Sequence, residues 1–379
     1  MASCQSAWRD ADLVVRAALI SRPGGDVVVT DVELDGPGEG EVTVRVVAAG
    51  VCHTDLALVT GGLPMPMPAV LGHEGAGVIE EVGPGVSGLV PGDHVVLTVL
   101  AHCRQCAHCL AGRPYDCAVG LGATFAGQLV TGRRALSRDG ALVNHFFGQS
   151  SFAQRVVVHE ATAIKIDDDI DLGIACLLGC GASTGIGAVL NTGAVAPGGS
   201  VAVFGCGGVG LAAIMGAALL GANDVVAIDL RASRLAAAAK VGATQIIEAG
   251  GDVAERVLAA VPGGVDLAID SVGHSAVVRQ ALSVCGPSGT ALIVGAAPAG
   301  TTYELESRLF KPSRRVVGNV GGSIVPEVDI PRYARLFAAG RLPLRELVTA
   351  ELGLDDVPEA LRRLQNGDGI RSVIHLDGA

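Results

Sequence analysis

The chain has 379 residues, of which 50% are hydrophobic, 3% are aromatic and 17% are charged. At about 150 residues per domain this length predicts two or three domains, and so apolar a chain is not disordered. Acidic residues outnumber basic ones by 38 to 27, which gives a net charge of −11. Because nucleic-acid-binding surfaces need clustered positive charge and the chain has no run of Lys or Arg, no nucleic-acid partner is expected.

The sequence predicts a soluble protein of the cytoplasm. The N-terminal segment contains Asp10 and Asp12 and lacks an uninterrupted apolar core, so it does not resemble a signal peptide. Residues 172–223 carry no charge at all, and a membrane span needs only about 20 residues. Frequent glycines and Pro197 interrupt this stretch, as is typical of a buried strand and helix of a parallel sheet. No membrane partner is expected.

The first half of the chain, to about residue 170, is rich in segments with the period of two of β-strands. Residues 41–47 alternate polar and apolar side chains, and residues 75–81 and 93–98 follow a similar pattern. Turns that contain Gly and Pro separate these segments. The pattern predicts an irregular, mostly antiparallel β domain.

From about residue 185, short apolar strands alternate with helical segments of about ten residues, which predicts an α/β domain with a doubly wound parallel sheet. The predicted strands are residues 200–204, 224–228, 245–248, 265–269 and 290–294, and the predicted helices are residues 211–220, 231–240, 252–260 and 275–283. Later helical segments include one that begins near Asp355, and a last strand over 371–376 is expected to return to the first domain. The predicted domains are therefore 1–184 and 185–322, followed by the returning segment 323–379.

A glycine-rich turn follows the first strand of the second domain. Its sequence is Gly205-Cys-Gly207-Gly208-Val209-Gly210. Chance matches to this pattern are expected in a chain with 54 glycines, and a turn without a ligand is the alternative. The turn nevertheless joins an apolar strand to a helix, where backbone N–H groups and the helix dipole can hold a pyrophosphate. We therefore expect a dinucleotide cofactor here.

The next predicted strand ends close to an acidic residue, Asp229. A carboxylate at this position accepts hydrogen bonds from the adenosine ribose hydroxyls and repels a 2′-phosphate. NAD is therefore favoured over NADP, although Arg231 and Arg234 temper that preference.

Four of the ten cysteines, Cys103, Cys106, Cys109 and Cys117, fall within fifteen residues. Four thiolates in tetrahedral coordination are typical of structural zinc. Disulfides or unligated thiols are the alternatives, but such tight spacing cannot easily form two unstrained disulfides. The nearby His102 and His108 are left out, because four cysteines complete the coordination sphere.

A second group of possible ligands is spread along the chain. Cys52 follows a predicted strand, His73 and Glu74 come about twenty residues later, and Cys180 lies just before the second domain. Two thiolates and one imidazole would form a zinc site with an open position, as catalysis requires. Taken singly, each residue is more typical of a structural role, since buried Cys is common and a lone His usually satisfies hydrogen bonds.

These motifs together resemble one family. CHTD at 52–55, GHEGAG at 72–77, the four-cysteine loop, GCG at 179–181 and GCGGVG at 205–210 occur in the order and at the spacing of the zinc-dependent medium-chain alcohol dehydrogenases. The resemblance covers nearly the whole chain. It implies a GroES-like catalytic domain, mostly β, joined to a Rossmann domain.

The resemblance also implies roles for single residues. Cys52, His73 and Cys180 match the catalytic zinc ligands, Glu74 a ligand that can exchange, and Cys103, Cys106, Cys109 and Cys117 the structural zinc site. Thr54 matches the hydroxyl that accepts the substrate proton, and Asp55 the carboxylate that orients the zinc-bound histidine. His53 and Arg371 match cations that bind the pyrophosphate. Residues 119–144 look like the long loop of the dimeric branch, which implies a homodimer.

Two departures from the family pattern bear on the substrate. Ala57 replaces a histidine that finishes the proton relay in many members, so water or His53 is expected to carry the proton. The anchors of the glutathione-dependent formaldehyde branch are not found, and Leu63 stands where one acidic anchor would be. Apolar pocket candidates, each also compatible with ordinary core packing, are Val99, Phe125, Phe146, Phe147, Val294 and Ala296. Of these, Val294 is also a candidate for cofactor binding.

The sequence thus predicts an NAD-dependent enzyme with two zinc ions that interconverts an apolar primary alcohol, benzylic or allylic, and its aldehyde. One alternative is the reduction of an iminium or conjugated carbonyl, which would suit the loss of the relay histidine. Another is a binding protein without turnover, and the intact matches to the zinc ligands and Thr54 argue against it.

Overall fold

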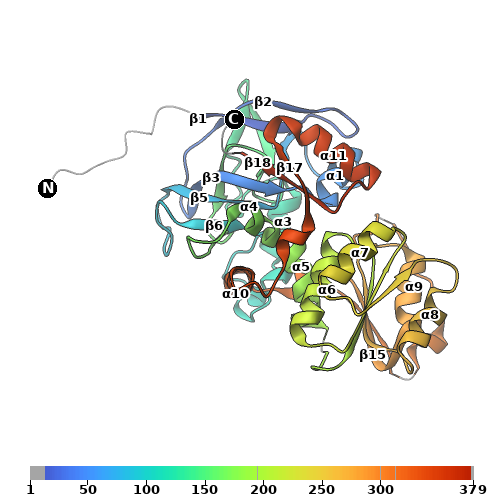
Figure 1. Cartoon of the computed structure of the whole chain (residues 1–379). Coiled ribbons are helices and arrows are strands. Elements are labelled where there is room, and N and C mark those ends of the chain that lie inside the picture. Colours follow the sequence, from blue (N-terminus) through green and yellow to red (C-terminus); the bar gives the residue numbers. More distant parts are fainter. Residues whose placement is uncertain (1–12, 194, 299, 312, 377–379) are drawn as a thin grey trace. The chain divides into compact units, whose positions relative to one another are not determined.

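The computed structural model describes residues 13–376 apart from residues 194, 299 and 312 (Figure 1). Most of the N-terminal segment, which does not resemble a signal peptide, lies outside the described residues. Within the described residues, no single helix is long and apolar enough to cross a membrane. One bent pair of helices, Leu172–Gly179 with Gly181–Thr192, is long and apolar enough only when its two members are taken together. The chain divides into two compact units, Met1–Gly179 with Ala350–Ala379, and Cys180–Thr349.

The first unit is built from two β-sheets. One is a closed barrel with the strand order β1-β2-β7-β8-β4, and the other has the order β10-β6-β5-β3-β18-β17, with β9 also paired to β3. The strands are β1 (Leu13–Ile20), β2 (Val27–Leu34), β3 (Glu41–Gly50), β4 (Ala69–Val70), β5 (Gly75–Val82), β6 (His94–Leu97), β7 (Leu136–Arg138), β8 (Ala141–His145), β9 (Arg155–His159), β10 (Ala163–Lys165), β17 (Val348–Gly353) and β18 (Arg371–His375). The pairs between β3 and β5, β9 and β18 are antiparallel, as the alternating pattern predicted.

The helices of the first unit are short. They are α1 (His53–Thr60), α2 (Ala107–Leu110), η1 (Pro114–Asp116), α3 (Ala118–Phe125), α4 (Leu172–Ala175), η2 (Cys176–Gly179), η7 (Leu354–Asp356) and α11 (Val357–Asn366). α11 buries Val357, Ala360 and Leu361, which lie three or four residues apart on one face, in the same core as the valines of β3. The strand predicted over 371–376 is β18, and it pairs with β3 next to Gly50.

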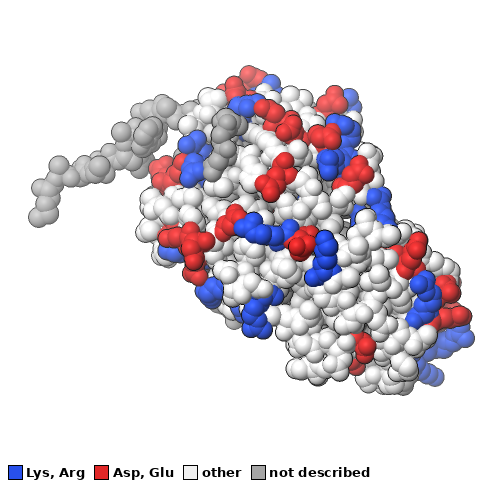
Figure 2. Space-filling view, viewed as in Figure 1, with Lys and Arg blue, Asp and Glu red and all other residues white. Residues whose placement is uncertain are grey.

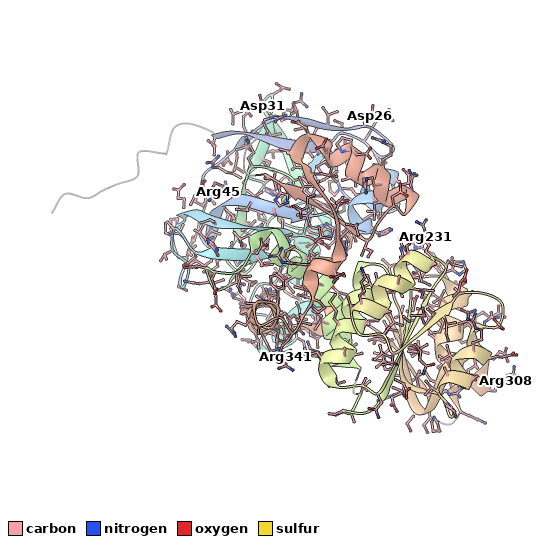
Figure 3. All side chains as sticks on the ribbon, viewed as in Figure 1. Asp26, Asp31, Arg45, Arg231, Arg308 and Arg341 are labelled. Atoms are coloured by element: carbon pink, nitrogen blue, oxygen red, sulfur yellow. The ribbon has the colours of Figure 1, made fainter. Side chains whose placement is uncertain are left out.

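Charges on the surface of the first unit pair between strands of one sheet, β3 and the two strands β5 and β9 that pair with it. Glu80 of β5 lies 2.6 Å from the Nε atom of Arg155 and 3.5 Å from that of Arg45, which is labelled in Figure 3. Such exposed pairs stabilise a fold by at most about 1 kcal/mol. Acidic and basic side chains are likewise intermixed on the face shown in Figure 2.

The second unit is a parallel six-stranded sheet with the order β13-β12-β11-β14-β15-β16. Figure 1 shows helices on both sides of the fan of strands, α6 and α7 on one and α8 and α9 on the other. The strands are β11 (Ser200–Phe204), β12 (Asp224–Asp229), β13 (Gln245–Glu248), β14 (Val265–Asp270), β15 (Cys285–Ile293) and β16 (Arg315–Gly318). The helices are α5 (Gly181–Gly187), η3 (Ala188–Thr192), α6 (Gly208–Leu220), α7 (Ala232–Lys240), α8 (Val253–Ala260), α9 (Ser275–Val284), η4 (Ser307–Phe310), η5 (Gly321–Ser323), α10 (Pro326–Ala338) and η6 (Leu344–Leu347).

The units divide at positions that differ from the predicted boundaries of 184 and 322. The second unit begins at Cys180 because α5 packs tightly on α6: a Cβ atom added to Gly185 would lie 2.2 Å from the carbonyl oxygen of Val209. It continues to Thr349, so α10 belongs to it rather than to the returning segment. The return of the chain to the first unit therefore begins at Ala350.

Candidate active site

The four clustered cysteines form a small lobe of the first unit. The sulfur atoms of Cys103, Cys106, Cys109 and Cys117 all lie within 4.8 Å of one another. Backbone N–H groups point at these sulfurs: that of Cys106 lies 3.3 Å from the Sγ atom of Cys103, and that of Gly120 lies 3.3 Å from the Sγ atom of Cys117. Such donors favour thiolates, which are the form that binds zinc.

Proton affinities in the lobe differ from those of isolated thiols. A backbone hydrogen bond from Cys109 lowers the pKa of Cys106 to about 7, whereas burial and the neighbouring thiols raise the pKa of Cys109 to about 12. Four sulfurs this close cannot all be thiolates without a cation among them. Zn²⁺ prefers this donor set and geometry, so the residues fit a structural zinc ion.

A second group brings together side chains that are far apart in the sequence. Ligand atoms of Cys52, His73, Glu74 and Cys180 all lie within 4.8 Å of one another. Cys52 ends the turn between β3 and α1, His73 and Glu74 lie between β4 and β5, and Cys180 directly follows Gly179 of η2. Two sulfurs and one imidazole nitrogen leave a position for a fourth ligand, which is typical of a catalytic rather than a structural zinc site.

Asp55 links the two segments that supply Cys52 and His73. Its Oδ1 atom lies 3.2 Å from the Nδ1 atom of His73 and accepts a hydrogen bond from the N–H group of Gly72, while its Oδ2 atom accepts one from the N–H group of Cys52 at 2.9 Å. Because Asp55 is itself fully buried, this carboxylate fixes both ligand segments in position.

The environment of His73 fits a metal ligand. The side chain is fully buried, and its Nε2 atom has no hydrogen-bond partner among the described residues. Burial alone lowers the pKa of His73, but the carboxylate of Asp55 and the thiol of Cys52 together raise it well above the ordinary value. A buried imidazole nitrogen that lacks a partner and faces anionic groups calls for a cation, and a zinc ion would supply one.

Glu74 is held by Arg371, the first residue of β18. The Nη2 atom of Arg371 lies 3.4 Å from the Oε1 atom of Glu74, and its Nη1 atom donates to the carbonyl oxygen of Val51 at 3.0 Å. Burial raises the pKa of Glu74 to about 7 even though Arg371 opposes that shift. Gly50 makes room for the carboxylate, because a Cβ atom there would lie 2.2 Å from Oε2 of Glu74. Arg371, predicted to bind a pyrophosphate, is thus largely buried beside the metal ligands.

Helix α1 contains the residues predicted to take part in proton transfer, Thr54 and His53, together with Ala57 at the position of the relay histidine. The hydroxyl oxygen of Thr54 lies 3.8 Å from the sulfur of Cys52, so it borders the position of the metal. His53 is exposed at the first position of α1, and Ala57 is half-buried one turn further on.

Two phenylalanines lie against His73. The rings of Phe146 and Phe147 each have centroids 5.2 Å from that of the imidazole, and 4.9 Å from each other. Phe147 has a φ angle of 51°, a left-handed conformation that is unusual for a bulky residue and often found at functional sites. The hydroxyl of Ser150 fixes this turn by accepting from the N–H group of Phe146 and donating to the carbonyl oxygen of Val70. Phe146 is fully buried, so the half-buried Phe147 is the ring that places apolar surface beside the metal ligands.

The other apolar candidates are more scattered. Phe125 is exposed at the end of α3, and the N–H group of Val99 donates to the carbonyl oxygen of Gly179. Val294 and Ala296 follow β15 in the second unit. Leu63 is half-buried and packs against the core of the first unit.

The glycine-rich turn lies between β11 and α6, as predicted. Gly205 has a φ angle of 89°, and a Cβ atom on Gly210 would lie 1.8 Å from the carbonyl oxygen of Gly205, so the fold itself requires these two glycines. A Cβ atom on Gly207 would meet no atom of the part of the chain that the structure describes within 4 Å. A glycine that packing does not require lets a ligand approach the backbone closely, as a pyrophosphate does at this position. Gly208 and Val209 begin α6, whose first N–H groups are available to an anion.

Asp229, the last residue of β12, is bonded to the glycine-rich turn itself, besides being the expected partner of the ribose. Its Oδ2 atom accepts a hydrogen bond of 2.7 Å from the N–H group of Cys206, and its Oδ1 atom accepts one of 2.9 Å from that of Arg231. Arg231 is labelled in Figure 3 at the start of α7. The Nη1 atom of Arg234 lies 3.9 Å from Asp229, close enough to partly neutralise it.

Sequence reasoning missed three residues beside this turn. Leu230 and Val272 are 75% and 50% exposed, although both are apolar. Leu230 directly follows β12 and Val272 lies two residues after the end of β14, and these strands are the two neighbours of β11. Exposed apolar side chains at the carboxyl ends of parallel strands suit the faces of a flat ring such as adenine. The third residue, Ser271, hydrogen-bonds to the turn itself. The one signal in the sequence was Leu230, an apolar residue that comes directly after Asp229 at the end of the strand.

Comparisons with known proteins place this site in a family. Residues 38–168 match the model of the alcohol dehydrogenase GroES-like domain, and residues 208–339 match that of the zinc-binding dehydrogenases. The chain belongs to the zinc-dependent alcohol dehydrogenases. It is therefore an oxidoreductase with a GroES-like domain and a Rossmann domain, which confirms the predicted family, fold class and enzyme class.

Individual relatives match over almost their full length. The NDMA-dependent alcohol dehydrogenase of Amycolatopsis methanolica is 38% identical over 95% of this chain and 98% of its own. The geraniol dehydrogenase of Castellaniella defragrans is also 38% identical, over 95% of this chain and 97% of its own. The crystal structure of the benzyl alcohol dehydrogenase from Acinetobacter calcoaceticus matches with a TM-score of 0.91 at 35% identity, over 96% of this chain and 99% of its own.

Proposed function

We propose that this dehydrogenase interconverts an apolar primary alcohol, benzylic or allylic, and its aldehyde, with NAD as the hydride acceptor. The observation that carries the proposal is the group formed by Cys52, His73 and Cys180, with the rings of Phe146 and Phe147 against the histidine. Relatives named for geraniol and benzyl alcohol support the substrate class, because in both alcohols the carbon that carries the hydroxyl is bonded to an unsaturated carbon.

The chain's own residues divide the work. When bound, zinc would polarise the substrate oxygen and NAD would take up the hydride. Thr54 accepts the hydroxyl proton, since its own hydroxyl borders the sulfur of Cys52. Asp55 holds the imidazole of His73 so that Nε2 is the free ring atom. Phe147, packed against the buried ring of Phe146, excludes water and favours apolar substrates.

The proton must then reach solvent without the relay histidine that Ala57 replaces. An alanine cannot titrate, so we assign the next step to His53, which is exposed on the same helix. A general acid or base in such a path contributes about 10²–10⁴-fold to the rate.

We further propose NAD rather than NADP as the cofactor, because the carboxylate of Asp229 would repel a 2′-phosphate. The enzyme is proposed to act as a homodimer in the cytoplasm, with an alcohol or aldehyde as its small-molecule partner and neither a nucleic acid nor a membrane as a partner. Segment 119–144, which forms α3, β7 and most of β8, is the proposed mark of the dimeric branch. Light scattering on the purified protein tests the dimer.

The proposal is tested by following the absorbance of reduced nicotinamide. Zinc-replete protein is mixed with NAD, or with NADP, and with benzyl alcohol, geraniol or ethanol. We expect NAD to be reduced with the first two alcohols at a higher kcat/KM than with ethanol, and not with the C52S variant. Equal rates with all three alcohols would contradict the apolar pocket, and faster turnover with NADP would contradict the role of Asp229.

A second mode of turnover is favoured by one specific observation, the similarity to an NDMA-dependent enzyme. If NAD stays bound after each cycle, free NADH does not accumulate, and turnover requires an external acceptor. The same assay repeated with an artificial electron acceptor therefore separates a bound cofactor from an inactive protein. The alternative, reduction of an iminium or conjugated carbonyl, is tested by mixing the enzyme with NADH and an enal or a cyclic imine and following the loss of NADH absorbance.

A further inference from the structure

The peptide bond between Gly205 and Cys206, in the glycine-rich turn, is held at both ends by side chains. Its N–H group donates to the Oδ2 atom of Asp229 at 2.7 Å, and its carbonyl oxygen accepts a hydrogen bond of 2.8 Å from the hydroxyl of Ser271. Asp229 ends β12 and Ser271 follows β14, so the two groups come from the strands on either side of β11. The peptide plane is therefore fixed from opposite sides.

Ser271 is closely built into the turn. Its hydroxyl also lies 2.9 Å from the carbonyl oxygen of Phe204, and its own N–H group donates to the same oxygen. A Cβ atom on Gly205 would lie 2.8 Å from the Ser271 hydroxyl oxygen, and one on Gly210 would lie 3.0 Å from it. Two glycines of the turn thus leave the space that this hydroxyl fills.

The orientation of this peptide matters for an anionic ligand. A pyrophosphate is attracted by N–H groups and repelled by carbonyl oxygens, so the turn binds it only while its carbonyls point into the protein. The hydroxyl of Ser271 is the donor that holds the Gly205 carbonyl inward. Without that donor the carbonyl loses its side-chain partner, and the peptide is held by Asp229 alone.

We propose that Ser271 is a positioning residue for the dinucleotide cofactor, which locks the Gly205–Cys206 peptide together with Asp229. The inference rests on the proposed use of this turn for NAD. It also gives Asp229 a second role: replacing that carboxylate removes a ribose partner and at the same time releases the turn. Ser271 affects cofactor affinity without touching the cofactor or the metal ligands.

The chain offers a matched control at the other end of the same strand. The hydroxyl of Ser200, the first residue of β11, donates to the Oδ2 atom of Asp266 on β14 at 2.9 Å. Ser200 and Ser271 therefore each join β11 to β14 through one hydroxyl, but Ser200 lies at the amino end, away from the turn. The Ser200 hydroxyl also accepts from the N–H group of Asp266 at 3.1 Å, so replacing Ser200 with alanine disturbs the β11–β14 pair at least as much as replacing Ser271 does.

The test compares S271A, S271T and S200A with the unaltered enzyme. Fluorescence titration gives the Kd for NADH and for ADP-ribose, which contains the pyrophosphate but no nicotinamide. We expect S271A to raise both Kd values by about three- to tenfold, the effect of one lost hydrogen bond. The KM for NAD should rise in parallel, while kcat, the KM for alcohol and the zinc content stay unchanged. S271T should restore tight binding, and S200A should leave both Kd values unaltered.

A merely structural Ser271 would behave like Ser200, with a lower melting temperature and an unchanged Kd. Equal Kd values for S271A and the unaltered enzyme would therefore overturn the inference, as would an equal rise in S200A. If S271A does not fold, the titrations are made with S271C, whose thiol is a weaker donor of similar size, and its Kd for NADH must rise while that of S200A does not. Failure of the unaltered enzyme to bind NADH would instead contradict the proposed function itself.

Discussion

The two metal groups of this protein are assembled in opposite ways. The four cysteines of the lobe come from one stretch of fifteen residues, so short turns bring their sulfurs together. The catalytic group takes ligands from positions 52, 73 and 180, which are far apart in the sequence and which only the folded chain brings within 4.8 Å of one another. A local group stabilises the segment that contains it, whereas a distributed group depends on the whole fold and keeps a position open for chemistry.

The sharpest way to separate the two groups is to remove one ligand from the distributed one. In C52S a hydroxyl replaces a thiolate, and we expect kcat/KM for benzyl alcohol to fall by at least about 10³-fold, because a catalytic metal contributes several kcal/mol. The melting temperature should change little, and zinc content should drop from two ions per chain to one. A variant that loses zinc but keeps its activity would contradict the assignment.

Removing one cysteine from the lobe should have the opposite pattern of effects, a large loss of stability and a small loss of activity. In C103S we expect the second zinc to be lost and the free energy of unfolding to fall by about 3 kcal/mol or more, because metal binding in such lobes contributes to folding directly. Protein that remains folded at low temperature should keep kcat within a few-fold of the original. Thermal melts and zinc analysis measure the first two quantities. A loss of kcat as large as that of C52S would show that the lobe is not purely structural.

Asp55 tests how far the distributed group depends on its surroundings. In D55N the amide keeps the shape of the side chain but loses the charge that holds the imidazole of His73 and the N–H group of Cys52. Loss of such an outer partner costs about 10- to 100-fold in metal affinity or activity. Timed removal of zinc by a chelator should show faster loss of one ion per chain, with the lobe zinc unaffected. Equal release of both ions would contradict this role.

The same contrast between local and distributed features explains what the sequence could predict. The lobe, the glycine-rich turn and the elements between residues 200 and 294 follow from spacing and periodicity within short windows. The elements were predicted to within a few residues, although β15 begins at Cys285 rather than at the predicted residue 290. The partnership of Glu74 with Arg371 could not be read from the sequence, because only the pairing of β18 with β3 brings them together. The left-handed backbone of Phe147 likewise depends on contacts of Ser150 with a distant strand. The boundary at Cys180 depends on glycine contacts between helices.

The fully buried histidines His73 and His145 differ in the direction in which their surroundings shift the pKa. His73 faces Asp55 and has a raised pKa, whereas His145, at the end of β8, has a pKa lowered to about 3 by burial and by the nearby Arg133 and Arg134. The Nε2 atom of His145 accepts a hydrogen bond from the N–H group of Ala135 at 3.0 Å. A second proton on the ring would have to displace that donor, so the folded protein keeps His145 neutral.

This difference predicts how stability changes with pH. Below about pH 6.5 the unfolded chain takes up a proton at His145 and the folded chain does not, until the pH approaches the folded pKa of about 3. The free energy of unfolding therefore falls by about 1.4 kcal/mol per pH unit in that window, or about 2 kcal/mol between pH 6.5 and pH 5. Urea unfolding of the original protein and of H145Q, each at pH 7.5 and at pH 5, measures this change in the free energy of unfolding. Acid release of zinc affects both proteins alike and cancels in the difference. The variant, which is less stable at pH 7.5, should lose about 2 kcal/mol less on acidification, and equal losses would mean that His145 is protonated in the folded state.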